Sequence, residues 1–522
     1  MEKTEQLIFK ASPNWIVIGF AVALWTVALF SGCSVGPPSL QAGVHSIDIT
    51  PEKLPAIRNG GFIQQTHDKV LDPLHARSFV FKSGNETIAI AVVDSCMIPR
   101  DVCNEAKKLA HQQTGIPVNR ILIASTHTHS APSVMDMCLG TNSDPNYETF
   151  LPPKIAEGIS KAHANLEPAR IGWTVVDAPE HTHCRRWLKH PDHYDTDPFG
   201  EETVRAMMHP GYQNPDYIGE AGPVDSGLSL LSIQSLDGSR PIGLLANYSM
   251  HYFGAPGGFS ADYYGRFCEL MEKQIATSDS GKAPFVTAMS QGTSGDLHWM
   301  DYSELKKEDY GIDQYTSELA DIALNAYQEI DYNTGKPDLA MAETTITLNR
   351  RLAGEERIAW SKELNAQRGD RRPENRPEVY GEQVIWFLKN PKEDLVLQAV
   401  RIGDLAITAM PNEVYGITGL KLKAQSPFKA TFNMELANGA AGYIPPPEQH
   451  YLGGYTTWPA RTAGLEPGAE PVIVDTLLGL LEELSDQKRK PLTTDFYNDQ
   501  QRAAIAKAKG EDNNRANRGL EH

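Results

Sequence analysis

The sequence predicts an α/β fold with a mixed β-sheet core, flanking helices and long loops. Short continuous apolar runs at residues 121–124 and 285–289 have the length of buried strands. Stretches such as residues 100–114 instead repeat apolar residues at helical spacing. The 42 glycines and 35 prolines indicate many turns and loops between these elements. A hydrophobic content of 41% and a charged content of 22% are typical of a soluble globular enzyme.

The chain begins with an apolar segment that we expect to be separate from the fold. Residues 15–30 are too short for a bilayer span but suit the apolar part of a signal peptide. The following Ser31-Gly32-Cys33 resembles a bacterial lipoprotein cleavage site, with a plain signal anchor as the alternative. We therefore assign residues 1–33 to a signal or anchor and residues 34–42 to a linker. The body of the protein is expected outside the cytoplasm, in the periplasm or on the outer surface of a bacterial cell envelope, with membrane association through the N-terminus.

Charge and cysteine content exclude two classes of function. A net charge of −18 argues against binding the phosphates of a nucleic acid. The six cysteines are widely spaced and form no C-x-x-C pair, so they predict neither a cysteine zinc site nor a dense disulfide framework. Apart from Cys33, we expect buried free thiols.

The domain is expected to span residues 43–487. It starts with an alternating strand at residues 43–50, a hairpin around Ser83-Gly84-Asn85 and a helix that ends at Gly115. Further strands are expected at residues 121–124, 170–176, 228–236, 241–248, 284–289, 340–348, 395–402, 405–409 and 430–435. Further helices are expected at residues 150–165, 262–277, 303–329, 415–423 and 472–485.

Two segments carry no regular pattern. Residues 177–225 contain six prolines and five histidines, which predicts an inserted loop acting as a solvated lid. A second metal site is the alternative for these histidines, but their spacing is irregular. Residues 488–522 are rich in charged residues, Asn, Gln and Ala, which predicts a polar, disordered tail.

Histidines follow the buried run at residues 121–124. His127 and His129 lie two residues apart, so in an extended segment they share one face and can converge on one ion or substrate. A strand that empties into a polar loop is how α/β sheets place metal ligands and acid–base groups.

Three other predicted strands end in the same way. The strand at residues 241–248 is followed by His251, and the strand at residues 405–409 by Glu413. The strand at residues 284–289 runs into a small-residue loop that closes on Asp296 and His298. Two imidazoles and one carboxylate are a common catalytic zinc set that leaves a position for water. The sequence therefore predicts a metal site formed by His127, His251 and Glu413.

These motifs resemble the neutral/alkaline, non-lysosomal ceramidase family over residues 43–484. The run Thr-His-Thr-His-Ser-Ala-Pro at residues 126–132 is very close to the family's Thr-His-Thr-His-Ser-Gly-Pro motif. Asp72-Pro73-Leu74-His75-Ala76-Arg77, Asn247 to His251, Gly295-Asp296, Pro411-Asn412-Glu413 and Gly442-Tyr443-Ile444 follow in the expected order. The resemblance implies a neutral-ceramidase-like catalytic domain.

The resemblance also implies roles for individual residues. It implies one Zn²⁺ per chain held by His127, His251, Glu413 and Tyr443. His129 would contact the substrate carbonyl or the attacking group, and either Arg185 or Arg186 would lie near the scissile amide. Tyr451 matches a second tyrosine of the pocket.

The sequence departs from the family at two places. His298 stands where the family's Gly-Asp-Val-Ser-Pro-Asn motif has its serine, so a serine-centred mechanism is not expected. The family's C-terminal immunoglobulin-like domain has no counterpart in the sequence. A metal-activated water does not need the serine, and His129 or His298 is then the expected general base. His298 has two other interpretations, as a further metal ligand or as a side chain packed under Trp299, while Tyr443 either binds the metal or stabilises the oxyanion.

We therefore expect a zinc-dependent hydrolase of an N-acyl amide bond that acts on a small-molecule or lipid amide such as a ceramide. One alternative is a metal-dependent hydrolase of another amide or ester with a small polar or carbohydrate-linked substrate. Another is an inactive envelope protein that binds a ligand, which the lost serine suggests.

Overall fold

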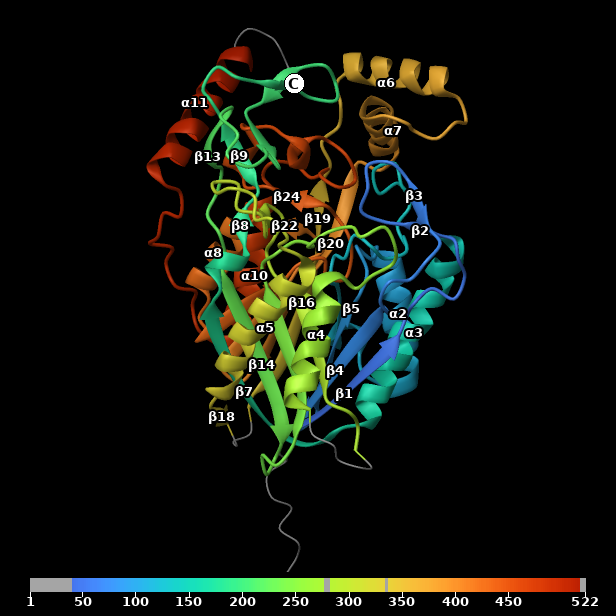
Figure 1. The fold of residues 1–522 in the computed structure, drawn as a ribbon, viewed down its shortest axis with the longest axis vertical. Coiled ribbons are helices and arrows are strands. Elements are labelled where there is room, and N and C mark those ends of the chain that lie inside the picture. Colours follow the sequence, from blue (N-terminus) through green and yellow to red (C-terminus); the bar gives the residue numbers. More distant parts are fainter. Residues whose placement is uncertain (1–39, 277–281, 334–336, 517–522) are drawn as a thin grey trace, which may run out of the picture. The chain divides into compact units, whose positions relative to one another are not determined.

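The computed structural model describes residues 40–276, 282–333 and 337–516 (Figure 1). It confirms the α/β prediction, with a mixed sheet and flanking helices. The expected signal or anchor, with Cys33, and most of the linker lie outside the described residues. Within the described part, no helix is long and apolar enough to cross a membrane. The five cysteines in this part are buried free thiols, as predicted.

A nine-stranded sheet forms the centre of the fold. Its strands pair antiparallel except for two parallel pairs, β15 with β16 and β5 with β6. In spatial order the strands are β16 (Val286–Gln291), β15 (Pro241–Tyr248), β14 (Gly227–Ser235), β7 (Glu167–Asp177), β1 (Gln41–Asp48), β4 (His75–Ser83), β5 (Glu86–Val93) and β6 (Ile121–Ser125), with β18 (Tyr332–Asn333) added beside β7.

A second sheet packs against one face of the first. Alternate residues of the large sheet, among them Phe79, Leu122 and Leu245, share a buried cluster with Val400 and Ile407 of the second sheet. The second sheet has the order β19 (Leu339–Asn349), β20 (Lys392–Ile402), β21 (Leu405–Ala409) and β23 (Ala430–Met434).

Helices cover the two outer faces of this pair of sheets. The other set of alternate residues in the large sheet packs against α2 (Arg100–Thr114) and α3 (Pro145–Ala164), and against α4 (Asp262–Ile275) and α5 (Ile312–Gln328). The outer face of the second sheet packs against α8 (Gly416–Gln425) and α10 (Ala469–Ser485). Because the sheets are covered on both faces, buried strands such as β6 and β21 are continuous apolar runs, which is why they were recognisable in the sequence.

The inserted segment at residues 177–225 is more ordered than predicted. It contains η3 (Pro179–His181), β8 (His183–Cys184), β9 (Arg186–Lys189), β10 (Asp195–Thr196), β11 (Glu202–Val204), β12 (Ala206–Met208) and β13 (Tyr217–Glu220). Strands β12, β9 and β13 form a small sheet, and β8 pairs with β17 (Leu297–His298). These strands have only two to four residues each, too few to produce a readable alternation.

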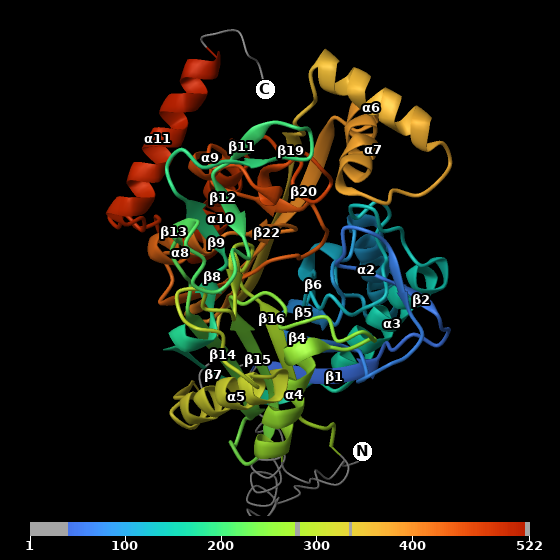
Figure 2. The same ribbon diagram turned by 45° about the horizontal axis from the view of Figure 1, so that its top comes forward.

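The prediction of a disordered tail is wrong for residues 499–516, which form α11 (Asp499–Ala516). Ala504, Ile505 and Ala508 pack against Leu188 and Ala206 of the inserted segment, beside which α11 lies in Figure 2. The apolar face of this helix is made mostly of alanine, so its composition resembles that of a solvated tail.

The remaining elements are short or were not predicted. Helices α6 (Glu355–Arg368) and α7 (Arg376–Lys389) pack on each other and are rich in charged residues, which hid their apolar faces. The others are β2 (Ala56–Arg58), β3 (Gln65–His67), η2 (Val118–Arg120), β22 (Glu413–Val414), β24 (Tyr443–Ile444), α9 (Pro447–His450) and η4 (Tyr455–Thr457).

Candidate metal centre and its surroundings

The ends of three strands bring His127, His251 and Glu413 together. His127 follows β6, His251 follows β15, and Glu413 opens β22 just after β21. The two Nε2 atoms are 3.0 Å apart, and Glu413 Oε2 lies 3.3 Å from Nε2 of His127 and 3.8 Å from Nε2 of His251. All three side chains are buried. This geometry can hold a metal ion.

His127 is fixed by its backbone and by its second ring nitrogen. Its φ angle is +70°, in the left-handed region that non-glycine residues rarely occupy, and its amide donates to the Ser95 carbonyl at 2.9 Å. Its Nδ1 lies 2.7 Å from the Cys96 carbonyl oxygen, so Nδ1 carries the proton and Nε2 offers its lone pair to the cluster. The Cys96 sulfur is also near Nδ1, at 3.8 Å, but burial raises the pKa of this thiol well above 9, which makes it a poor ligand.

His251 is held by a buried chain of polar groups that the sequence did not point to. Its Nδ1 lies 3.4 Å from the Ser294 hydroxyl, which donates to Glu435 at 2.8 Å and accepts from Gln291 at 2.7 Å. Burial, followed by the charge of Arg185, lowers the pKa of His251 well below its usual value. The ring is therefore neutral, and its Nε2 faces His127. A carboxylate behind a ligating histidine is a common means of orienting such ligands.

Replacing Ser294 by alanine is expected to weaken metal binding about 10–100-fold, because the ring of His251 loses the hydroxyl that orients it. The measurement is a competition between the protein and a zinc-sensitive chelator. Ser290→Ala is the matched control, since Ser290 lies on the same segment and bonds to Ala246 and Asn247 instead. Equal affinity of Ser294→Ala and wild-type protein would contradict this role.

Glu413 and Tyr443 are neighbours because β22 and β24 pair in parallel with these two residues in register. The Glu413 Oε2 atom is buried and has no hydrogen-bond partner among the described residues. Burial and the Glu413 carboxylate raise the pKa of Tyr443 well above 10, so its hydroxyl is protonated. An acceptor oxygen without a donor, close to two imidazole nitrogens, is a donor set that fits a divalent cation.

His129 lies on the other side of His127, with the two Nε2 atoms 3.0 Å apart. Its ring stacks on Tyr252 with centroids 3.8 Å apart, and its Nδ1 side lies against the backbone of Gly60. Burial, then the neighbouring His127, lowers the pKa of His129 well below its usual value. The Nε2 of His129 is therefore an unprotonated base that faces the cluster.

Of the two adjacent arginines, Arg185 reaches the cluster. Its Nη2 lies 3.2 Å from Nε2 of His251, 3.2 Å from the Tyr443 hydroxyl and 2.8 Å from the Gly295 carbonyl oxygen. Arg186 points elsewhere, because its guanidinium donates to the Tyr415 hydroxyl and to the carbonyls of Gln449 and Gly453. Of the two alternatives left open by the sequence, only Arg185 lies beside the cluster.

Tyr455 occupies the place predicted for Tyr451. The Tyr455 hydroxyl is 3.1 Å from that of Tyr443, whereas Tyr451 packs with Leu188 and Leu452 of a separate apolar cluster. Two glycines with positive φ, Gly453 and Gly454, turn the chain between the two tyrosines. The turn was visible in the sequence as Gly-Gly, but the direction of each ring was not.

Asp296 and His298 are not members of the cluster formed by His127, His251 and Glu413. Asp296 Oδ1 accepts from the Gly416 amide at 2.8 Å, at the start of α8, and burial raises its pKa to about 6. His298 is 2% exposed, and its Nδ1 has no hydrogen-bond partner among the described residues. Its ring lies 5.2 Å from His209 and 6.0 Å from Trp299, centroid to centroid. The interpretation as a further metal ligand finds no support, because His298 is not among the groups close enough to share an ion.

His209 is a residue of the inserted segment that the sequence did not single out. Its Nε2 lies 3.4 Å from Nη1 of Arg185, and its Nδ1 lies 2.6 Å from the Tyr302 hydroxyl. The inserted segment therefore contributes Arg185 and His209 to the surroundings of the cluster.

The inserted segment also makes stability depend on pH through Glu220. Glu220 accepts from the Cys184 amide at 3.2 Å, and burial raises its pKa from 4.5 to about 7. Its protonated form favours folding, so this contribution is complete below pH 4.5 and is lost as the pH rises through 7. The difference between these two pKa values corresponds to roughly 3 kcal/mol in the free energy of unfolding.

Glu220→Gln keeps an acceptor and removes the charge, so it is expected to raise the melting temperature at pH 8 and leave it unchanged at pH 4. The exposed Glu363→Gln on α6 is the control. Equal melting temperatures of Glu220→Gln and wild-type protein at pH 8 would refute the assignment.

Comparisons with known proteins agree with the arrangement of these strands. Residues 41–299 match the family model described as neutral/alkaline non-lysosomal ceramidase, N-terminal. A structure described as "Ceramidase complexed with C2" superposes with a TM-score of 0.64 at 15% identity. Neutral ceramidase from Pseudomonas aeruginosa superposes with a TM-score of 0.61 at 16% identity. Both matches cover 88% of this chain and 77% of the other.

A search of curated protein sequences gave no match. At these identities the structural likeness shows the fold alone. The family match includes His127, His129, His251 and His298, and ends before Glu413 and Tyr443. Through residues 41–299, the chain belongs to the neutral/alkaline non-lysosomal ceramidase family.

Proposed function

We propose that this protein hydrolyses the amide bond of an N-acyl lipid such as a ceramide, with one Zn²⁺ held by His127, His251 and Glu413 and by the hydroxyl of Tyr443. The observation that carries the proposal is the buried Glu413 Oε2, which has no hydrogen-bond donor in the described part of the chain and lies within 4 Å of two imidazole nitrogens. When bound, the ion would polarise the acyl carbonyl and lower the pKa of a water molecule.

The side chains around the cluster supply the remaining chemistry. His129 Nε2 takes a proton from the attacking water as its oxygen bonds to the acyl carbon. The same nitrogen returns the proton to the amine as the C–N bond breaks, which leaves a free amine and a carboxylic acid that releases its remaining proton to solvent. Arg185 is the cation that stabilises negative charge on the carbonyl oxygen, and Tyr455, whose hydroxyl lies beside that of Tyr443, presents a hydroxyl donor.

The test is a panel of N-acyl amides, from ceramides to short acyl amides, given to zinc-loaded wild-type protein. We expect turnover that a chelator abolishes and that His129→Ala lowers by about 10²–10⁴-fold. Absence of turnover on the whole panel would overturn the proposed activity.

Variants of His298, measured on the same panel, test whether ceramide is the substrate. If His298→Ser cleaves ceramide and the wild type cleaves only short or polar amides, the ceramide assignment is wrong while the amide chemistry stands. His298→Ala separates the loss of the imidazole from the gain of a hydroxyl.

We also propose that the protein is exported and tethered to a membrane of the cell envelope through lipidation of Cys33. The support is the sequence of residues 1–33 alone. Wild-type protein is expected to label with radioactive palmitate and to sediment with membranes, and Cys33→Ala is expected to do neither. Unlabelled wild-type protein in the soluble fraction would contradict the tether.

A further inference from the structure

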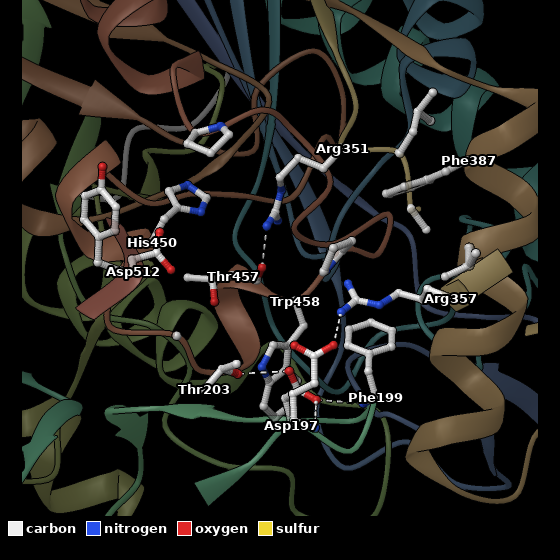
Figure 3. A pocket seen from close by; sticks show the side chains of 18 of the residues that line it. Asp197, Phe199, Thr203, Arg351, Arg357, Phe387, His450, Thr457, Trp458 and Asp512 are labelled. Carbon is white, nitrogen blue, oxygen red and sulfur yellow. Dashed lines mark hydrogen bonds and ion pairs between the residues drawn. The ribbon is translucent and has the colours of Figure 1, made fainter. Parts of the chain in front are cut away.

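A separate cavity of about 580 Å³ lies where the inserted segment, α6 and α7 meet residues 447–467 (Figure 3). Its volume is typical of pockets that bind small molecules. It shares no lining residue with the metal cluster. The residues used below are Phe199, Arg351, Arg357, Phe387, His450 and Trp458.

Arg351 brings an uncompensated positive charge to this cavity. Its guanidinium donates to the main-chain carbonyls of Leu465 at 3.0 Å and Thr457 at 2.6 Å, and also to that of Ala463. No ion pair joins it to a carboxylate within the described part of the chain. Burial, with Arg357 nearby, lowers its pKa to about 10, so it remains charged at neutral pH. Three of its five N–H groups are used, which leaves two for another acceptor.

The other ionisable groups of the wall have interactions of their own. Burial lowers the pKa of His450 to about 3, so this ring is neutral. The remaining charged side chains are each engaged: Glu201 with Arg357 at 2.8 Å, Arg205 with Glu511 at 3.0 Å, Asp197 with its own turn, and Asp512 with a partner of its own.

Trp458 lines the same wall and carries a second unused donor, which lies just beneath the wall's surface and reaches a ligand when the ring turns toward the cavity. Its side chain is 4% exposed, and its indole Nε1 has no hydrogen-bond partner among the described residues. An indole nitrogen can only donate, so burial without an acceptor is unfavourable. The wall also has apolar members, among them Phe199 and Phe387 (Figure 3).

We propose that this cavity binds an organic monocarboxylate with an apolar body. The carboxylate compensates Arg351, a ligand oxygen accepts from the indole of Trp458, and the body packs against Phe387 and Phe199. The inference is independent of the proposed amide hydrolysis, because it concerns binding at residues that the hydrolysis does not use.

The experiment measures binding of hexanoate to the full chain by calorimetry, with hexanol as the neutral and hexylamine as the cationic counterpart. We expect one saturable site for hexanoate and none for the other two. In ¹⁵N-tryptophan-labelled protein, the indole N–H resonance of Trp458, assigned with Trp458→Phe, is expected to move downfield as it gains an acceptor.

Two variants test whether hexanoate binds to Arg351 specifically or to any positive charge of the cavity. Arg351→Gln is expected to weaken hexanoate binding at least roughly tenfold, whereas Arg357→Gln, which removes a cation already paired with Glu201, is expected to change it less. Should Arg351→Gln not fold, Trp458→Phe decides, because it removes an unused donor and so should keep the melting temperature while weakening hexanoate binding. Absence of saturable hexanoate binding, equal binding of hexanol, or unchanged binding in Trp458→Phe would overturn the proposal.

Discussion

His127→Ala is expected to lose the bound metal and to lower amide turnover roughly thousandfold, because the carbonyl polarisation supplied by the metal is worth several kcal/mol. The substitution removes the nitrogen that lies closest to both other groups of the cluster, at 3.0 Å from His251 and 3.3 Å from Glu413. Metal content by mass spectrometry and turnover on the preferred amide are the two readouts. His193→Ala, on the exposed part of the inserted segment, is the control.

The backbone of His127 adds a second expectation at the same position. Because its φ angle is +70°, a glycine there relieves strain that alanine retains. Without metal, His127→Gly is therefore expected to be more stable than His127→Ala by about 1 kcal/mol in denaturant unfolding. A metal content equal to that of wild type in either variant would contradict the assignment of His127 as a ligand.

Gly60→Ala is expected to lower turnover about a hundredfold while the metal stays bound, because it displaces His129 and not a ligand. A Cβ at this position would lie 2.5 Å from Cγ and 2.6 Å from Nδ1 of His129, and the φ angle of +95° disfavours any other residue. The loss should appear in kcat, since His129 is placed to move a proton.

Gly115→Ala is the matched control for this change. Gly115 also has a positive φ, +75°, but nothing lies within 4 Å of its added Cβ. Gly115→Ala therefore measures the effect of backbone strain alone, without a steric clash against a neighbouring side chain. Equal effects of the two substitutions on turnover would show that the position of His129 is unimportant.

The parts of the site predicted from the sequence are those on buried strands. The apolar runs before His127, His251 and Glu413 identified three strand ends, and strands of two packed sheets deliver their ends to one place. Periodicity could not predict which of Arg185 and Arg186 turns inward, because Arg185 lies between two short strands, β8 and β9, and the register of β9, which Arg186 opens, depends on its partners.

Other parts depended on long-range packing. The carboxylate behind His251 comes from Glu435, 184 positions away along the chain (435 − 251), so no local motif connects them. Tyr455 replaces Tyr451 because two left-handed glycines redirect the chain. Helix α11 was missed because its buried face is mostly alanine, which a composition-based prediction treats as solvated.

The presence of a divalent ion between His127, His251 and Glu413 is the central claim. Crystals of the purified protein, measured just above and just below the zinc absorption edge, test it without reference to activity. One anomalous peak per chain, about 2 Å from Nε2 of His127, Nε2 of His251 and Oε2 of Glu413 and present only above the edge, is the expected result. A fully occupied site at another set of residues, or no peak between these three atoms in zinc-supplemented crystals, would contradict it.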